Sequence, residues 1–261
     1  MNKLILIFLS FILLSGCSFL KRGSGKSGGT DTSSLIETSK TRFKLTDKAG
    51  EFVVYRENGR SKSSFISKRE VVPFDDDKSK VLEQGIAISK IGAVGKSFKI
   101  MRPYKSQYSV WFDGKRYQTN MSLDEKTRKL DVKLKSPEKQ WNGIQSFPFP
   151  DSKSIYCFYS QVLECAAITG YFSRVLEKKR GQMNFYVIWD GYPYFQEQYL
   201  NVPNSLFSKA QFNYDGKNKL GESRFSLKFG GQVIFYLLDK KNKFVKKFWI
   251  TQGLSMVASD I

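Results

Sequence analysis

Apolar and polar residues alternate along most of the chain after position 40, a pattern typical of half-buried β-strands. Residues 129–135 alternate strictly, so one face of that strand is expected to be apolar and the other solvated. Segments of similar character predict strands at 52–55, 63–72, 85–91, 95–101, 108–112, 116–121, 183–189, 194–200, 210–214, 224–229, 233–238 and 244–251. The turns between them suit hairpins that join antiparallel neighbours: Asn58-Gly59, Asp113-Gly114, Asp190-Gly191, Asp215-Gly216, Gly230-Gly231 and residues 239–242.

One segment has a helical period instead. Apolar residues recur at spacings of three and four from Ile155 to Ala167, which predicts a helix near 152–168. Asp151 or Ser152 would be its N-cap, and Gly170 would end it. A long loop, 137–150, precedes this helix, and residues 171–179 either extend it or begin a strand.

These elements predict a mainly β fold, in which residues 41–261 form a single antiparallel domain of about a dozen strands with one main α-helix. A strongly curved sheet that wraps around its helix, as an open barrel or half-barrel, would cover the apolar face. A β-sandwich is the alternative.

The first 17 residues follow a different pattern. Lys3 precedes an apolar run from Leu4 to Leu14, and Ser15, Gly16 and Cys17 follow. A charged start, a short apolar stretch and a small-residue site are typical of a secretory signal peptide, too short to span a bilayer. Leu14-Ser15-Gly16-Cys17 resembles the lipobox of bacterial lipoproteins. An ordinary signal peptide with an incidental cysteine is the alternative.

The lipobox resemblance implies that residues 1–16 are removed after Gly16 and that Cys17 carries acyl chains such as palmitate. Residue 18 is serine rather than aspartate, which in that family implies an outer-membrane anchor in the inner leaflet, facing the periplasm. Residues 17–40 are rich in glycine and serine and predict a flexible tether to the membrane.

Charge and missing residue types narrow the chemistry. The formal net charge is +19, which implies anionic partners such as lipid head groups or a cell-envelope polymer. Nucleic acid is not expected as a partner of an exported protein. The candidate contacts with an anionic surface are Lys178, Lys179, Arg180, Lys240, Lys241, Lys246 and Lys247. Lysine also blocks pairing at exposed strand edges, which is the structural explanation for such runs.

The chain has no histidine, which removes the usual general base and the commonest metal ligand, so neither a metal nor a cofactor is expected. Cys157 and Cys165 could pair in an oxidising compartment. A continuous helix would hold their Cα atoms roughly 12 Å apart, beyond disulfide reach, so helix and disulfide exclude each other. The periodicity favours the helix, with both thiols buried.

The length, lipobox, strand number and lone helix together resemble the periplasmic half-barrels of the lipoprotein-carrier and lipoprotein-receptor family, although no sequence motif carries this likeness. The resemblance implies an apolar concavity for acyl chains. The candidate lining residues are Phe158, Val162, Phe185, Trp189, Phe235 and Phe248, for which a place in the core is the alternative.

Three functions follow as hypotheses. The first is a noncatalytic lipoprotein that binds a hydrophobic or amphiphilic ligand in its concave sheet, in a cavity of several hundred cubic ångströms. The second is an envelope scaffold that binds a protein or anionic polymer through its basic surface, with a filled core. The third, ranked last, is a glycosidase with a carboxylate pair drawn from Asp113, Asp190, Glu197 and Glu222.

Overall fold

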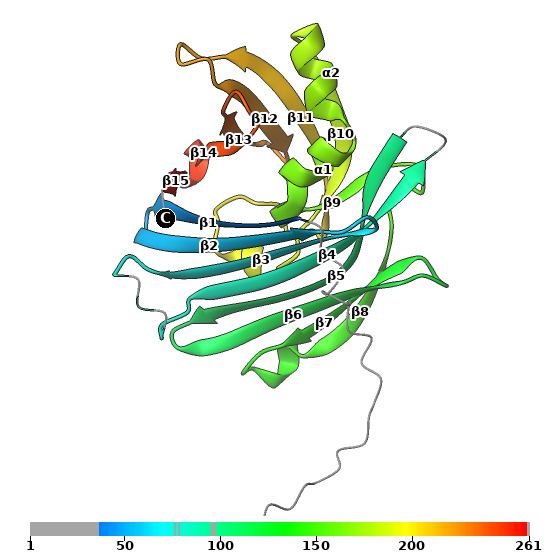
Figure 1. Cartoon of the computed structure of the whole chain (residues 1–261). Coiled ribbons are helices and arrows are strands. Elements are labelled where there is room, and N and C mark those ends of the chain that lie inside the picture. The colour runs from blue at the N-terminus through cyan, green and yellow to red at the C-terminus, as the bar shows by residue number, and fades with distance from the viewer. Residues whose placement is uncertain (1–36, 76, 78, 95–97, 260–261) are drawn as a thin grey trace, which may run out of the picture. The chain divides into compact units, whose positions relative to one another are not determined.

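A computed structural model describes residues 37–75, 77, 79–94 and 98–259 (Figure 1). The predicted signal peptide, its cleavage site at Gly16, the lipidation site Cys17 and most of the predicted tether lie outside these residues. The first strand begins at Glu37, four residues inside the segment predicted as tether. Within the described part of the chain, no helix combines the length and apolar character needed to cross a membrane.

The described residues build one open, largely antiparallel sheet of 15 strands, as the sequence predicts. Its spatial order is β8-β7-β6-β5-β4-β3-β2-β1-β15-β14-β13-β12-β11-β10-β9, so the first strand sits in the middle and pairs with the last. Only β9 and β10 pair in parallel. The strands are β1 Glu37–Asp47, β2 Gly50–Arg60, β3 Ser64–Pro73, β4 Glu83–Val94, β5 Phe98–Phe112, β6 Lys115–Asp124, β7 Lys129–Lys135, β8 Gly143–Pro148, β9 Tyr156–Phe158, β10 Gln182–Ile188, β11 Phe207–Lys217, β12 Ser223–Phe229, β13 Gln232–Leu238, β14 Phe244–Trp249 and β15 Leu254–Ser259.

The sheet curves around three short helices, α1 Val162–Ile168, α2 Tyr171–Lys178 and α3 Tyr194–Glu197 (Figure 1). We call the face that carries these helices the inner face. Short 3-10 turns stand at Lys139–Trp141, Tyr159–Gln161 and Ile250–Gln252. Phe172 of α2 packs edge-on against Phe225 of β12, whereas Arg56 of β2 pairs with Glu164 of α1. Helices therefore cover the inner face on both sides of the central strand.

Alternation along the strands decides which side chains form the core. In β13, Gln232, Ile234, Tyr236 and Leu238 are buried and the residues between them are half-buried, because successive side chains of a strand point to opposite faces. Trp189 lies in the inner core, where its ring stacks on Phe195 with centroids 5.7 Å apart. Aromatic rings thus fill much of the interior.

The helix predicted at 152–168 is shorter than its period indicates. The Asp151 carboxylate accepts hydrogen bonds from Lys153 N and Ser154 Oγ, which is capping chemistry, yet residues 156–158 are extended. They form β9 because their backbone pairs with Tyr186–Ile188 of β10. Helical structure starts only at Tyr159, and residues 171–178 form a separate helix after Gly170.

The prediction of two free thiols is wrong for the same reason. Cys157 lies on β9 and Cys165 on α1, so the chain between them is not a continuous helix. Their Cα atoms are 6.2 Å apart and the two residues form a disulfide. The bond ties the first inner helix to the end strand of the sheet.

Two predicted turns and one predicted loop also differ from the structure. Asn58-Gly59 lies within β2, and the turn follows at 61–63, where Ser61 Oγ accepts from the backbone N–H groups of Ser63 and Ser64. Asp215-Gly216 lies within β11, beside an irregularity in its pairing with β12. The predicted loop 137–150 contributes the exposed edge strand β8.

The segment predicted as a strand at 194–200 contains the helix α3. A Cβ on Gly191 would lie 2.8 Å from the Tyr108 ring, so this glycine permits a close approach to β5 and is not a hairpin turn. Tyr194 and Phe195 are buried on the inner face. Aromatic residues with strand propensity are here drawn into a helix by packing.

Candidate functional site

The structure buries four of the six predicted apolar lining residues, three in the main hydrophobic core and Phe158 in a second cluster with Leu130 and Ile188. Phe158, Val162, Phe185 and Trp189 are buried. Phe235 and Phe248 instead pair across β13 and β14 on the opposite face, half-buried. The prediction assigned these two residues to the wrong face of the sheet.

The basic residues predicted to contact an anionic surface lie in different parts of the fold. Lys178 ends α2, and Lys179 and Arg180 follow it, all exposed; Lys240 and Lys241 are exposed in the β13–β14 turn. Lys246 lies over the Phe248 ring, 4.5 Å from its centroid. Lys247 points the other way, towards the inner face, where its Nζ lies 3.5 Å from Tyr159 Oη. The structure therefore does not gather these cations into one patch.

The four candidate carboxylates lie in four different connections or helices. Asp113 is in the β5–β6 turn, Glu197 ends α3, and Glu222 accepts a 2.6 Å hydrogen bond from Asn218 Nδ2. Asp190 directly follows β10. Burial raises the pKa of its carboxyl, which accepts a hydrogen bond from Ser160 N. Each of these carboxylates thus has its own local setting.

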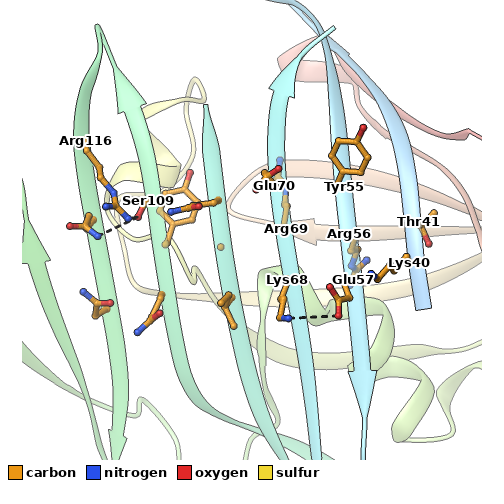
Figure 2. Close-up of a pocket in the computed structure, with 17 residues that line it drawn as sticks. Lys40, Thr41, Tyr55, Arg56, Glu57, Lys68, Arg69, Glu70, Ser109 and Arg116 are labelled. Carbon is orange, nitrogen blue, oxygen red and sulfur yellow. Dashed lines mark hydrogen bonds and ion pairs between the residues drawn. The ribbon is translucent and has the colours of Figure 1, made fainter. Parts of the chain in front are cut away.

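An outer trough of about 700 Å³ crosses β1–β6 (Figure 2). It lies on the face opposite the helices. Arg56 of β2 contacts α1, so its neighbours Tyr55 and Glu57 point outward into the trough. The outward side chains that line it are Lys40, Tyr55, Glu57, Lys68, Glu70, Gln84, Ile86, Gln107, Ser109, Arg116, Gln118 and Asn120.

Strand register sorts these residues into two parallel rows. The first row runs across adjacent strands through Arg42, Tyr55, Glu70, Gln84, Ser109, Gln118 and Lys135. The second runs through Lys40, Glu57, Lys68, Ile86, Gln107, Asn120 and Lys133. Two residues along a strand separate the rows, roughly 7 Å, and seven strands span about 29 Å.

Charge is distributed unevenly along the rows. Each row begins and ends with a cation. Glu70 and the pair Glu57–Lys68 lie on β2 and β3, and side-chain amides follow on β4, β5 and β6. Lys68 Nζ lies 3.7 Å from Glu57 Oε1, and Arg116 Nη2 donates to Ser109 Oγ at 3.1 Å (Figure 2). The trough is thus polar, with basic ends.

Two ion pairs lie on the inner face, behind the trough. Arg69 Nη1 is 2.6 Å from Glu83 Oε1, and Arg56 Nη2 is 2.7 Å from Glu164 Oε1. Burial raises the pKa of the Glu83 carboxyl, and attraction to Arg69 opposes that rise. These four residues hold β2, β3, β4 and α1 together with charged contacts.

Sequence reasoning missed the outer trough because its residues are ordinary surface residues one by one. The signal that could have found it is the alternation of β2–β6, which places polar residues such as Glu57, Gln84 and Gln118 at outward positions. Strand pairing, which brings those positions into rows, cannot be read from a single sequence.

No group of three or more acidic or cysteine side chains in the described ranges could hold a metal ion. Neither a protein-family model, nor a curated protein, nor a solved structure matches this chain.

Proposed function

We propose that this protein is a noncatalytic lipoprotein of the bacterial cell envelope that binds an anionic polysaccharide along its outer trough. The observation that carries the proposal is the pair of polar rows, with amides in the middle and cations at the ends. An extended polymer suits a groove that crosses so many strands, because neighbouring units can contact equivalent positions.

The middle of the trough supports recognition of hydroxyl and amide groups. Gln84, Gln107, Gln118 and Asn120 each offer donors and an acceptor, which is the mixed capacity that sugar hydroxyls and acetamido groups need. Tyr55 adds a half-buried ring at the β2 side. Such contacts hold a neutral stretch of polymer between its charged groups.

The ends of the rows support recognition of negative charge. Lys133 and Lys135 are exposed on β7 beside the last amides of each row. At the other end, Lys40 and Arg42 of β1 stand beside Glu57 and Tyr55. Carboxylates or phosphates of the polymer would meet these cations, and salt would weaken the contact because the charges are near solvent.

The size of the interior cavities weighs against the first hypothesis, a hydrophobic ligand in the concave sheet. The two cavities beside Arg69 on the inner face measure about 60 and about 20 Å³. Pockets for lipid-sized ligands are roughly 300–1,000 Å³. The outer trough reaches that range and the inner cavities do not, so the geometry favours the second hypothesis.

The membrane anchor is tested at Cys17. In the native host, the wild-type chain is expected to incorporate labelled palmitate and sediment with membranes, because several acyl chains on one cysteine bind firmly. The Cys17→Ser variant should lose both the label and the sedimentation. Equal membrane association of the two proteins, without label on either, would rule out the anchor.

The trough is tested with paired charge variants. Full-length Lys133→Gln/Lys135→Gln in nonionic detergent should bind isolated cell-wall sacculi about 5- to 30-fold more weakly than wild type, since two exposed contacts of about 0.5–1 kcal/mol each are lost. Lys178→Gln/Lys179→Gln removes the same charge from the end of α2 and should bind like wild type. Co-sedimentation across a salt series measures both.

Two outcomes would count against the trough as the binding site. One is equal weakening by the two double variants, which would indicate attraction by net charge alone. The other is unchanged binding of sacculi by both double variants. If the Lys133/Lys135 variant instead bound anionic vesicles more weakly than the Lys178/Lys179 variant, while both bound sacculi equally, the ligand of the trough would be a membrane rather than a polysaccharide.

A further inference from the structure

A second hollow lies on the inner face, between the sheet and α1, and none of the hypotheses drawn from the sequence accounts for it. This inner slot measures about 60 Å³. Three cations, Arg56, Arg69 and Lys247, line it, and no described carboxylate does. Strands from both halves of the sheet contribute, since Arg69 lies on β3 and Lys247 on β14.

Only one of the three cations lacks a carboxylate partner. Arg56 and Arg69 pair with Glu164 and Glu83, as described above. Lys247 forms no ion pair with any described residue; its Nζ is 3.5 Å from Tyr159 Oη and 5.6 Å from the centroid of that ring. Lys247 is therefore the one cation of the inner slot without an ion pair to a described residue, and this position suits a monoanion.

A buried hydroxyl points to the same kind of ligand. Ser67 is 2% exposed, lines the inner slot, and its Oγ has no hydrogen-bond partner. A buried polar group without a partner costs about 1–3 kcal/mol, so such groups in native proteins generally meet water or a ligand. An oxygen atom of a bound anion would accept from this hydroxyl.

The remaining walls are largely apolar, with Tyr159, Ser160 and Tyr236 as their polar members. Phe43, Val54, Val162, Leu163, Phe244 and Met256 enclose the rest of the inner slot. Its volume equals about four water-sized spheres, too little for a whole acyl chain. Leu163, Phe244 and Lys247 are only half-buried, so this side of the inner slot is the one nearest to solvent.

The electrostatics of Lys247 favour a negatively charged ligand. Burial and repulsion from Arg69 and Arg56 together lower the pKa of this ammonium to about 7, although attraction to Glu83 partly opposes them. A negative group beside Nζ would favour the charged form. The neighbouring Lys246 faces the other side of the sheet, so the two consecutive lysines differ in role.

We propose that the inner slot binds the carboxylate of a small aliphatic acid, with its oxygens at Lys247 Nζ and Ser67 Oγ and its short chain against the apolar wall. A single uncompensated cation fits a carboxylate better than a doubly charged phosphate. Apolar walls fit an aliphatic chain better than an inorganic ion. This site is independent of the outer trough, which lies on the opposite face of β1–β6.

Calorimetric titration of the full-length chain in nonionic detergent with butyrate tests the site. At about pH 6, below the pKa of Lys247, butyrate should bind saturably with one site per chain. Lys247→Met should weaken binding by about 10- to 150-fold, because a charge-assisted contact is lost, and Ser67→Ala by about 3- to 10-fold. Lys246→Met, a matched change on the other face, should leave binding unchanged.

Four results would overturn the proposal. They are no saturable binding to folded wild-type protein, equal binding of n-butanol, tighter binding of inorganic phosphate than of butyrate, and equal losses in the Lys246 and Lys247 variants. Circular dichroism of each variant shows whether the fold is kept. Ser67→Ala provides a second test if Lys247→Met does not fold, since it removes a hydroxyl without a partner. Binding of sacculi by these variants should stay as in wild type.

Discussion

Replacement of Arg69 with methionine is expected to lower the free energy of unfolding by about 3–5 kcal/mol, since it leaves a buried charge without its partner. Glu83 is 5% exposed, and Arg69 supplies its 2.6 Å ion pair across β3 and β4. Methionine fills a similar volume but offers no positive charge. Urea denaturation of full-length wild type and variant measures the difference.

The double variant Arg69→Met/Glu83→Leu is the control. It removes both charges, so its stability should lie within about 1 kcal/mol of wild type or above it. Recovery of that kind would show that the loss in the single variant comes from the stranded carboxylate rather than from lost packing. A single variant as stable as wild type would mean that water reaches Glu83.

The loss should also depend on pH. Burial raises the pKa of Glu83, and the variant lacks the arginine that opposes this rise. A carboxyl whose pKa is raised in the folded state binds its proton more tightly there, so its contribution favours folding at low pH and is lost as pH rises through the folded pKa. The deficit of Arg69→Met relative to wild type should therefore be smaller at about pH 5 than at about pH 8.

Much of the sheet was predictable because apolar and polar residues alternate in the sequence of a strand with one buried face. β7 has the bounds that the strict alternation at 129–135 predicts. The turns at Asp113-Gly114 and Gly230-Gly231 are confirmed as two-residue hairpin loops. The helix near 152–168 failed at its start because residues 156–158 pair with β10, a contact about 30 residues away in sequence.

The sites were less predictable, because they depend on which face a residue occupies and on what lies opposite. Lys246 and Lys247 are adjacent and chemically identical, yet only Lys247 enters the inner slot. Arg69 stands in a run of charged residues whose orientation the sequence does not reveal. Arg69 shares the inner slot with Tyr159 and Lys247, which only the fold brings beside β3.

Replacement of Trp189 with alanine is expected to lower the free energy of unfolding by about 3–5 kcal/mol, the usual loss for a large buried ring. Its side chain is fully buried and its ring lies 4.8–5.7 Å, centroid to centroid, from those of Tyr159, Phe229 and Phe195. Its Nε1 also donates to Ser208 Oγ at 2.9 Å, so truncation leaves a buried hydroxyl without its donor. Thermal and urea denaturation of the full-length chain measure the loss.

The control is Phe248→Ala, which truncates a predicted lining residue that lies on the outer face of the sheet. Phe248 is half-buried and pairs with Phe235 on the outer face, so its truncation should lower the free energy of unfolding by about 1 kcal/mol, the contribution of a cross-strand pair.

The comparison of the two variants decides between a filled interior and a ligand chamber. In a chamber, truncation of Trp189 would enlarge an existing space at little loss of stability and would increase binding of lipid. A filled core predicts the reverse, a large loss of stability with no gain in lipid binding, and a small loss for Trp189→Ala would return the hydrophobic-ligand hypothesis to first place.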